Sequence, residues 1–483
     1  MLPAAWRYKR FHISYVLTWL CSGLLLGLVA GQFVRFAIWW PFAAVALLLV
    51  IASLKSRRWY ACVLIVIAGF LAGSLRGSLF AQDLGALDAD IGKNISITGS
   101  ITQDPVITNG SNVWQVQLDS LRVGGGSVTG NAYATVVSDE VLKRGDIVTI
   151  SGKAAPGFGT FQISLYRANL LHVLRPNNPF LAARDSFAEA VRRAMPEPEA
   201  SLGLGFVVGQ KSALPTDLSE QLKTVGLTHI VVASGYNLTI LVRFARRLLA
   251  RRSRYLALAG SLTLVIGFVL VSGFSASMNR AAIVTVLSLL AWYYGRKFHP
   301  IQLILYVAAA SALMNPLYVW GDLGWLLSFA AFTGVLVVAP IISKALHKKD
   351  TEPGATSQLV IETLSAELMT LPIIIVSFGY IPVLALLANI LVAPIIPVAM
   401  LLTFIAGVVG WLAPSLIILA LPANILIAYV VAIVGWLSSP EWARLPVTVS
   451  LTVGLLWYAA LTVAGWLLWR HHKVDLLASS VVE

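Results

Sequence analysis

One apolar stretch, Gly226–Val242, carries many polar side chains for a segment that could cross a membrane. Polar groups are costly in hydrocarbon, so His229, Ser234 and Asn237 should face a protein interior or a water-filled cavity. Gly235 permits a break in the helix or the close approach of another backbone. For Ser234 and Gly235 alone, a helix contact through small residues explains the pattern equally well. The whole set favours a functional segment that lines a water-filled cavity.

The spacing of these residues adds a constraint. In a helix, Ser234 and Asn237 share a face, whereas His229 is rotated by about 140° from Ser234. An unbroken helix therefore cannot present all three side chains to one cavity. If they act together, the helix must unwind near Gly235.

Ionisable side chains occur in two later apolar runs. Arg280, preceded by Asn279, lies near the start of one run. An arginine at this depth suggests a functional site that is paired or faces a cavity, where it would lower the cost of admitting an anion. The alternative is an arginine whose side chain reaches back to the membrane surface. Glu362 and Glu367 lie in another run, and either could be the partner of Arg280.

Prolines interrupt several of these runs. Pro316 breaks one run, Pro372 a second, and Pro394 with Pro397 a third, and Asn389 lies between the last two breaks. Broken helices at membrane depth are tolerated where they are buried in protein or line a water-filled cavity. Several breaks in one bundle favour a conduit over a passive scaffold.

The elements that must position these residues are membrane spans. Of the 483 residues, 58% are hydrophobic and only 12% are charged, which is about half the charged share of a soluble domain. Recurrent apolar runs predict a polytopic α-helical membrane protein of about 12 spans, the first of them uncleaved rather than a signal peptide. The expected spans are 13–34, 36–54, 59–80, 226–242, 255–273, 276–295, 299–319, 323–343, 358–379, 382–409, 412–437 and 447–469.

Basic clusters predict how the spans are oriented in the cytoplasmic membrane. With about 12 spans, every cluster falls on the cytoplasmic side, both termini are cytoplasmic, and residues 81–225 lie outside. The densest cluster is explained by a stop-transfer anchor, with contact to acidic lipid or nucleic acid as the alternative. It comprises Arg243, Arg246, Arg247, Arg251, Arg252 and Arg254.

The net charge of +13 is weak evidence for a nucleic-acid partner. Residues 81–225 hold 12 basic and 14 acidic residues, a balance of −2. The remaining 23 basic and 8 acidic residues make +15 and lie among the spans, where the orientation rule already explains them. The two cysteines, Cys21 and Cys62, lie in expected spans and show neither a disulfide framework nor a metal-binding spacing.

Residues 81–176 alternate apolar and polar residues with a period of two, which predicts β-strands. The simplest way for five strands to close into one sheet is a barrel of the OB type. We expect this barrel to be extracytoplasmic and inserted after the third span. Such barrels often bind single strands through aromatic and basic side chains, although core packing is the alternative, above all for Trp114. The strands are expected at about 93–102, 112–123, 127–138, 145–153 and 161–173. The binding candidates are Arg122, Tyr133, Lys153 and Phe158, with Trp114 and Phe161 beside them.

Four other segments complete the expected domain organisation. Residues 1–80 form a three-span membrane segment, and residues 177–225 form amphipathic surface helices. Residues 226–470 form the main membrane bundle, and residues 471–483 form a short cytoplasmic tail.

Motifs throughout the chain resemble those of the ComEC-type competence family. Gly226–Gly235 is similar to its GL.HLLAVSG.H signature, and Asn279–Ala282 is similar to its S..RA element. Gly324–Ala331 resembles GFQLSFLA, and Leu371–Pro394 resembles LP…FG…NLL..P. The order of N-terminal spans, OB-like domain and bundle also matches, and this joint order is more specific than any one motif.

This resemblance implies a channel that moves single-stranded DNA across the cytoplasmic membrane during natural transformation, without a cofactor. It implies contact with membrane lipid, and it suggests a cytoplasmic DNA-translocating ATPase, an extracytoplasmic DNA receptor, a separate nuclease and a homo-oligomer as partners. The residues expected at the conduit are His229, Ser234, Gly235, Asn237, Asn279, Arg280, Ser328, Glu367 and Asn389.

The chain departs from the family pattern in three places. Asn237 replaces the second histidine of the signature, and Leu326 replaces the glutamine of GFQLSF. Many family members carry a C-terminal metallo-β-lactamase-like domain, and the seven histidines here include no H-x-H-x-D-H set. We therefore expect a form that lacks this domain, with no metal site and no catalytic residues, and with any nuclease on another chain.

Two other functions remain open at this point. A carrier for a smaller polar solute would use the same broken helices, and inverted repeats would favour it. A membrane-embedded enzyme would use His229 and Glu367, but it would need a tighter set of acids, bases or metal ligands.

Overall fold

The computed structural model describes residues 12–35, 40–56, 59–85, 87–107, 112–210, 214–231, 235–273, 276–347, 354–472 and 474. The chain divides into two compact units. Unit 1 contains residues 1–176 and 301–325, and unit 2 contains residues 177–300 and 326–483.

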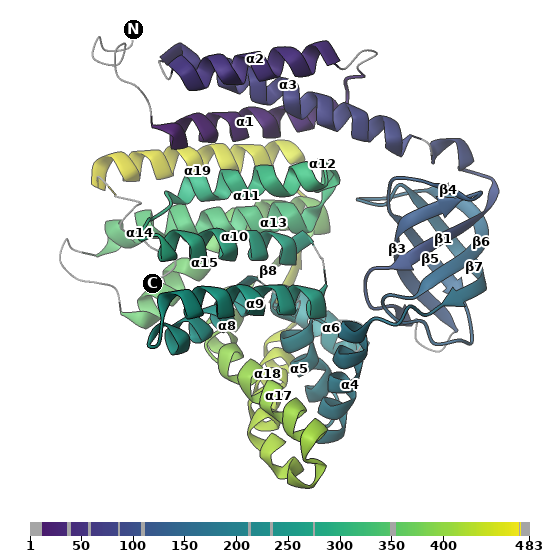
Figure 1. Ribbon diagram of the computed structural model, residues 1–483. Coiled ribbons are helices and arrows are strands. Elements are labelled where there is room, and N and C mark those ends of the chain that lie inside the picture. Colours follow the sequence, from purple (N-terminus) through teal and green to yellow (C-terminus); the bar gives the residue numbers. More distant parts are fainter. Residues whose placement is uncertain are drawn as a thin grey trace. The chain divides into compact units, whose positions relative to one another are not determined.

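Unit 1 begins with three helices, α1 (Ile13–Gly31), α2 (Trp40–Ser56) and α3 (Trp59–Leu84). Helices α1 and α3 lie side by side because each presents a row of glycines to the other (Figure 1). A Cβ atom on Gly31 would lie 2.6 Å from the Ser74 carbonyl oxygen, and one on Gly77 would lie 2.9 Å from the Leu28 carbonyl oxygen. The row is Gly23, Gly27 and Gly31 on α1 with Gly69, Gly73 and Gly77 on α3, a small-residue interface of the kind that membrane helices use.

Two later helices of the chain complete the helical part of unit 1. They are α11 (Pro300–Met314) and α12 (Leu317–Gly321). Ala309 and Ala312 of α11 share a buried cluster with Leu24 and Leu28 of α1. The Trp320 indole nitrogen donates a hydrogen bond to the Leu28 carbonyl oxygen at 2.8 Å.

The β-domain of unit 1 is a closed barrel of five long strands, as expected from the alternating pattern (Figure 1). Strands run in the circuit β1–β6–β7–β5–β3 and back to β1, and β5 pairs parallel with β7 while the other neighbours are antiparallel. The strands are β1 (Asn94–Ile101), β3 (Val113–Val123), β5 (Ala132–Val137), β6 (Ile147–Pro156) and β7 (Ile163–Leu174), with short β2 (Val106–Ile107), β4 (Gly126–Ser127) and the 3₁₀ turn η2 (Asp88–Asp90) beside them.

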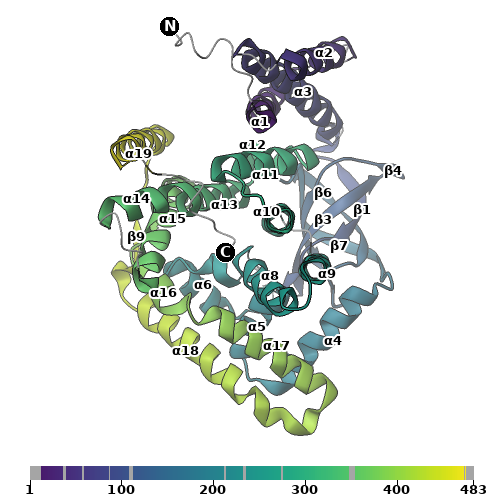
Figure 2. The same cartoon turned by 60° about the vertical axis from the view of Figure 1, so that its left-hand side comes forward.

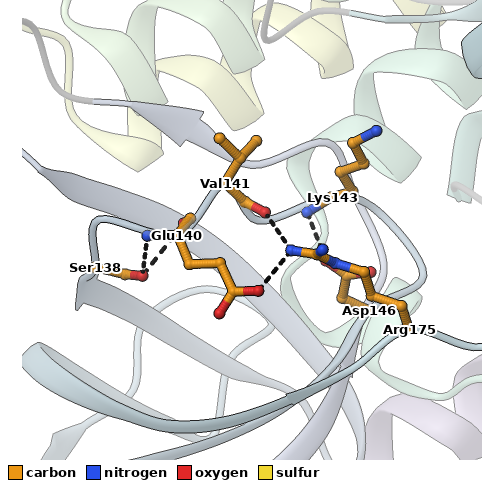
Figure 3. A network of polar contacts seen from close by, with 6 residues as sticks. All are labelled: Ser138, Glu140, Val141, Lys143, Asp146 and Arg175. Atoms are coloured by element: carbon orange, nitrogen blue, oxygen red, sulfur yellow. Dashed lines mark hydrogen bonds and ion pairs between the residues drawn. The ribbon is translucent and has the colours of Figure 1, made fainter.

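A polar network joins the β5–β6 loop to the end of β7 (Figure 3). Arg175 Nη2 lies 2.7 Å from Glu140 Oε1 and donates to the Val141 carbonyl oxygen at 3.2 Å. Asp146 accepts the Lys143 backbone N–H at 2.8 Å and is 5% exposed. Burial raises the pKa of Asp146, although the Lys143 N–H and the Arg175 charge act in the opposite direction.

The main buried cluster of unit 2 is built from helices of residues 177–225 and from the later pair α17 (Ile396–Leu412) and α18 (Leu421–Ser438). Helix α5 lies at the centre of this cluster, because its side chains after Glu199 are apolar or small on every face. Helices α17 and α4 lie side by side (Figure 2). Gly407 of α17 lets the Phe187 ring of α4 approach the α17 backbone. The other elements are α4 (Pro179–Ala194), α5 (Glu199–Val208), α6 (Thr216–Thr224) and the 3₁₀ turn η4 (Pro414–Ala420).

The rest of unit 2 contains two further helical groups. The first comprises α7 (Thr228–Val231), α8 (Gly235–Ala250), α9 (Arg254–Ser272) and α10 (Ala276–Tyr293), and α8, α9 and α10 share a buried cluster. The second comprises the helices α13 (Leu323–Thr333), α14 (Ala339–Leu346), α15 (Ala355–Phe378), α16 (Ala385–Val392) and α19 (Leu451–His472). The first three residues of α13 belong to unit 1. The short elements of this group are the π-helical turn η3 (Gly334–Val338), the strands β8 (Tyr380–Pro382) and β9 (Arg444–Pro446) and the turn η5 (Glu441–Ala443).

Among the described residues, seven helices are long and apolar enough to cross a membrane, or eight if α16 and α17 form one span bent by 52°. The bend occurs at Pro394, as the sequence predicts. Helix α11 and the apolar part of α2 are shorter than the roughly 20 residues that a span needs. The count of 12 spans and the external position of the barrel stay predictions.

Pro372 does not interrupt its helix, contrary to the sequence-based expectation. Helix α15 continues through Pro372 to Phe378. Pro372 cannot donate to the Leu368 carbonyl oxygen, and the Trp457 indole of α19 donates to that oxygen at 3.1 Å. The Tyr458 hydroxyl donates to the next carbonyl oxygen, that of Met369, at 2.6 Å. A neighbouring helix thus satisfies the freed backbone group, which membrane helices with proline require.

Candidate nucleic-acid interface and conduit residues

Four aromatic side chains form a cluster on the outside of the barrel. Tyr133 of β5 lies 5.2 Å from Phe158, 5.8 Å from Phe161 and 6.5 Å from Tyr166, measured between ring centroids. Phe158 is 49% exposed and Tyr166 is 55% exposed. Exposed aromatic faces of this kind suit stacking on nucleobases. We call these four residues the aromatic cluster.

The local backbone explains why the rings gather there. Tyr133 points outward because its neighbours Ala132 and Ala134 point into the barrel core. Phe158 and Phe161 lie in the β6–β7 loop, where Gly159 has a φ of +59°. Burial, and secondarily Tyr166, raises the pKa of Tyr133.

The structure brings Tyr133 and Phe158 together, but it places Arg122, one of the two predicted cations, elsewhere on the barrel. Arg122 pairs with Thr98 of β1, away from the β3 position that faces Tyr133. Lys153 is exposed on β6, where it pairs with Asn94 of β1 on one side, and the register with β7 sets it beside the bulge at Tyr166 and Arg167 on the other. Trp114 packs against the barrel core and donates to the Ser138 carbonyl oxygen at 3.2 Å, which supports the core interpretation of this residue.

Arg167 is a cation beside the aromatic cluster that the sequence analysis missed. It follows Tyr166 in a bulge of β7, has a φ of +52°, and donates its backbone N–H to Thr135 Oγ1 at 2.7 Å. A bulge redirects a side chain at the edge of a site. A basic residue next to an aromatic one inside an alternating strand is the only sequence signal.

Among the conduit candidates of unit 2, Asn237 has a buried structural contact. Its side-chain amide is 1% exposed and donates to the Phe206 carbonyl oxygen at 3.0 Å. Phe206 lies in the last turn of α5, where carbonyl oxygens have no partner within the helix. Asn237 therefore joins α8 to the end of α5.

The predicted helix over Gly226–Val242 is in fact two described helices. Helix α7 ends at Val231 and α8 begins at Gly235, and Ser234 lies outside the described residues. His229 is exposed on α7, with its Nδ1 atom 3.1 Å from the Gly226 carbonyl oxygen. Helix α8 also extends to Ala250, so it carries the first arginines of the densest basic cluster.

Gly235 and Arg280 lie at successive contacts between helices. A Cβ atom on Gly235 would lie 2.9 Å from the Cβ atom of Ala281, so α8 and α10 meet there closely. Arg280 is 3% exposed, and its guanidinium carbon lies 5.6 Å from the Phe329 ring centroid on α13. Asn279 and Ser328, half-buried, are the chain neighbours of Arg280 and Phe329. This contact pairs a buried cation with an aromatic face.

Glu367 and Asn389 form a hydrogen bond with each other, and the sequence did not predict this pairing. Asn389 Nδ2 donates to Glu367 Oε1 at 3.3 Å and joins α16 to α15. Glu362 instead accepts a hydrogen bond from Gln358 of its own helix at 2.8 Å. A Cβ atom on Gly334, in the π-helical turn after α13, would lie 2.5 Å from the Ser365 carbonyl oxygen.

These contacts form a series through unit 2. They join α5 to α8, α8 to α10, α10 to α13, η3 to α15 and α15 to α16. The described conduit candidates other than His229 therefore lie at or beside contacts between helices, where a change in one side chain alters helix packing. Among the described residues, no three His, Cys, Asp or Glu side chains gather closely enough to hold a metal ion.

Comparison with known proteins identifies one family. The family model described as "Competence protein" matches residues 206–471, which is more than half of the chain. No curated protein and no solved structure matches significantly.

Proposed function

Because this chain belongs to the competence protein family, we propose that it carries single-stranded DNA across the cytoplasmic membrane during natural transformation. The observation that carries the proposal is the family match over residues 206–471, which contains every expected conduit residue. The long apolar helices support a position in a membrane.

The barrel supports a single-stranded substrate. We assign it to the OB type from its closed circuit of five strands, and OB barrels bind oligonucleotides. The aromatic cluster offers faces that stack on any base. Residues 81–225 carry two more acidic than basic residues, so few phosphates are neutralised and stacking must supply most of the affinity.

We propose that both termini are cytoplasmic and that the barrel lies outside, where it meets the strand before the bundle does. Cysteine labelling tests this orientation in a variant whose Cys21 and Cys62 are alanine. An impermeant maleimide should label Thr129→Cys in intact cells and label Arg251→Cys only after lysis. Labelling of Arg251→Cys in intact cells would contradict the proposed orientation.

Deleting the gene and scoring transformation tests the function directly. Transformation with marked DNA should be lost and should return when the gene is supplied in trans, while small-solute uptake stays unchanged. Normal transformation without the gene would refute the proposal, and a defect confined to solute uptake would favour a carrier.

We further propose that the chain works with other proteins. A cytoplasmic ATPase would draw the strand inward, an external receptor would deliver it, and a nuclease on another chain would remove the complementary strand. Crosslinking in membranes during transformation should capture such partners or a second copy of this chain. A chain captured with none of them would contradict this part of the proposal.

A further inference from the structure

Unit 1 contains a cavity whose barrel side, with the ends of α1 and α3, lies outside the residues of the competence match. Its volume is about 300 Å³, and it lies between the β6–β7 loop of the barrel and the ends of α1, α3 and α12. Phe161 and Gln162 line it on the barrel side, and Gln32, Trp320 and Gly321 line it on the helix side. We call it the loop cavity.

From the chemistry of its lining, and resting on the proposed function, we propose that the loop cavity binds one nucleobase of single-stranded DNA as the strand leaves the barrel. A nucleobase has apolar faces and an edge of donors and acceptors. Phe161 and Trp320 supply aromatic faces. The Gln32 amide, which has both donor and acceptor atoms, makes no hydrogen bond to another described residue and can meet a base edge.

Aromatic residues line both sides of the cavity and continue beyond it on each side. Phe161 belongs both to the cavity lining and to the exposed aromatic cluster, where its ring centroid lies 5.3 Å from that of Phe158. On the other side, Trp320 lies 5.8 Å from Phe80. The Arg76 guanidinium lies 5.1 Å from the Phe80 ring centroid, one ring beyond the cavity. A strand stacked along these rings meets a cation that can pair with its phosphate.

Gly321 offers a way to fill the cavity without disturbing the fold. A Cβ atom there would have the Gly159 carbonyl oxygen as its nearest neighbour at 3.9 Å, an ordinary contact. Gly321→Phe should therefore fold and occupy the space of the base. Gly267→Phe is the matched control, because a Cβ atom on Gly267 of α9 meets nothing within 4 Å.

The test uses the full chain in lipid nanodiscs and a short oligothymidylate in which one base is 5-iodouracil. Irradiation should crosslink the base to Phe161 or Trp320, as mapped by mass spectrometry. Gly321→Phe should abolish these crosslinks and leave those at Tyr133 and Phe158, and Gly267→Phe should change neither. Trp320→Ala should weaken binding by about 5- to 150-fold, the range expected when one stacked base is lost.

Three results would overturn the inference. Crosslinks confined to Tyr133 and Phe158, and insensitive to Gly321→Phe, would remove the loop cavity from the DNA path while the proposed function stands. A phospholipid that is retained in the cavity and not displaced by the oligonucleotide would assign the cavity to lipid. Absence of any crosslink, together with normal transformation in the deletion strain, would refute the proposed function as well.

Discussion

The side-chain amide of Asn389 donates a hydrogen bond to the carboxylate of Glu367, with 3.3 Å between Nδ2 and Oε1. This contact joins α16, which ends before the bend at Pro394, to α15. It places two polar residues of the expected conduit at one helix contact.

Exchanging the two groups tests whether this hydrogen bond matters for transport. Asn389→Asp alone sets two carboxylates against each other, which forces one to take up a proton or the helices to separate. Transformation per inserted protein should fall at least tenfold. Adding Glu367→Gln restores one donor and one acceptor and should recover most of the activity. Equal activity of the single and double variants would show that the contact is not needed.

Trp457 and Pro372 should be energetically coupled. Trp457→Phe removes the N–H that satisfies the Leu368 carbonyl oxygen, and the loss of such a hydrogen bond costs about 0.5–1.5 kcal/mol. In a Pro372→Ala background the helix supplies its own N–H, so the same change should cost much less. Thermal unfolding of the four proteins in detergent measures the coupling. Additive effects would contradict this account of the unbroken helix.

The α1–α3 interface predicts an unusually large effect of one methyl group. Gly27→Ala would place Cβ against the Phe70 carbonyl oxygen, so the helices must separate, at a cost of about 1–3 kcal/mol. Gly267→Ala is the control, because its Cβ meets open space, and it should raise stability by roughly 0.5–1 kcal/mol through helix propensity. Fluorescence-detected thermal unfolding of both variants should show shifts of opposite sign.

Asp146 predicts a pH-dependent stability of the barrel. Burial raises the pKa of Asp146 in the folded protein above its value of about 4 in the unfolded chain. The contribution of Asp146 to stability is therefore complete below the unfolded-state pKa and is lost as the pH rises through the folded-state pKa. Asp146→Asn keeps an oxygen for the Lys143 N–H and removes the buried charge. The variant should be more stable than the parent at neutral pH, with the difference vanishing in acid. Hydrogen exchange of β6 amides, compared at equal pH, measures this difference.

Arg280 should need both its charge and its planar shape. Arg280→Ala should abolish transformation at normal insertion levels, and Arg280→Lys should retain part of it, because an ammonium keeps the charge but cannot stack on Phe329 as a guanidinium does. Phe329→Leu should resemble Arg280→Lys. The exposed Arg251 provides the control, since Arg251→Ala should transform normally. Normal transformation by Arg280→Ala would mean that the cation serves only as an anchor.

Some features of the fold follow directly from local sequence patterns. The five strands of the barrel begin and end within three residues of their predicted positions, except that β5 begins five residues later, because alternation between core and solvent recurs every two residues. The helix breaks near Pro316 and Pro394 are also predicted by the sequence, since proline lacks the N–H that a helix interior needs. The glycine rows of α1 and α3 are present in the sequence as repeats every four residues, but the contact between the two helices was not predicted from them.

The sequence by itself determined the class of the chain, a membrane protein with a β-barrel, and the motifs that mark the competence family. Only the tertiary structure decided which polar residues meet. It paired Glu367 with Asn389, set Arg280 over Phe329 and used Asn237 to satisfy the end of α5. It also kept α15 continuous through Pro372, because a donor from α19 replaces the missing N–H. Periodicity assigns a residue to a face of its own helix, whereas the partner on that face comes from a segment far away in the chain.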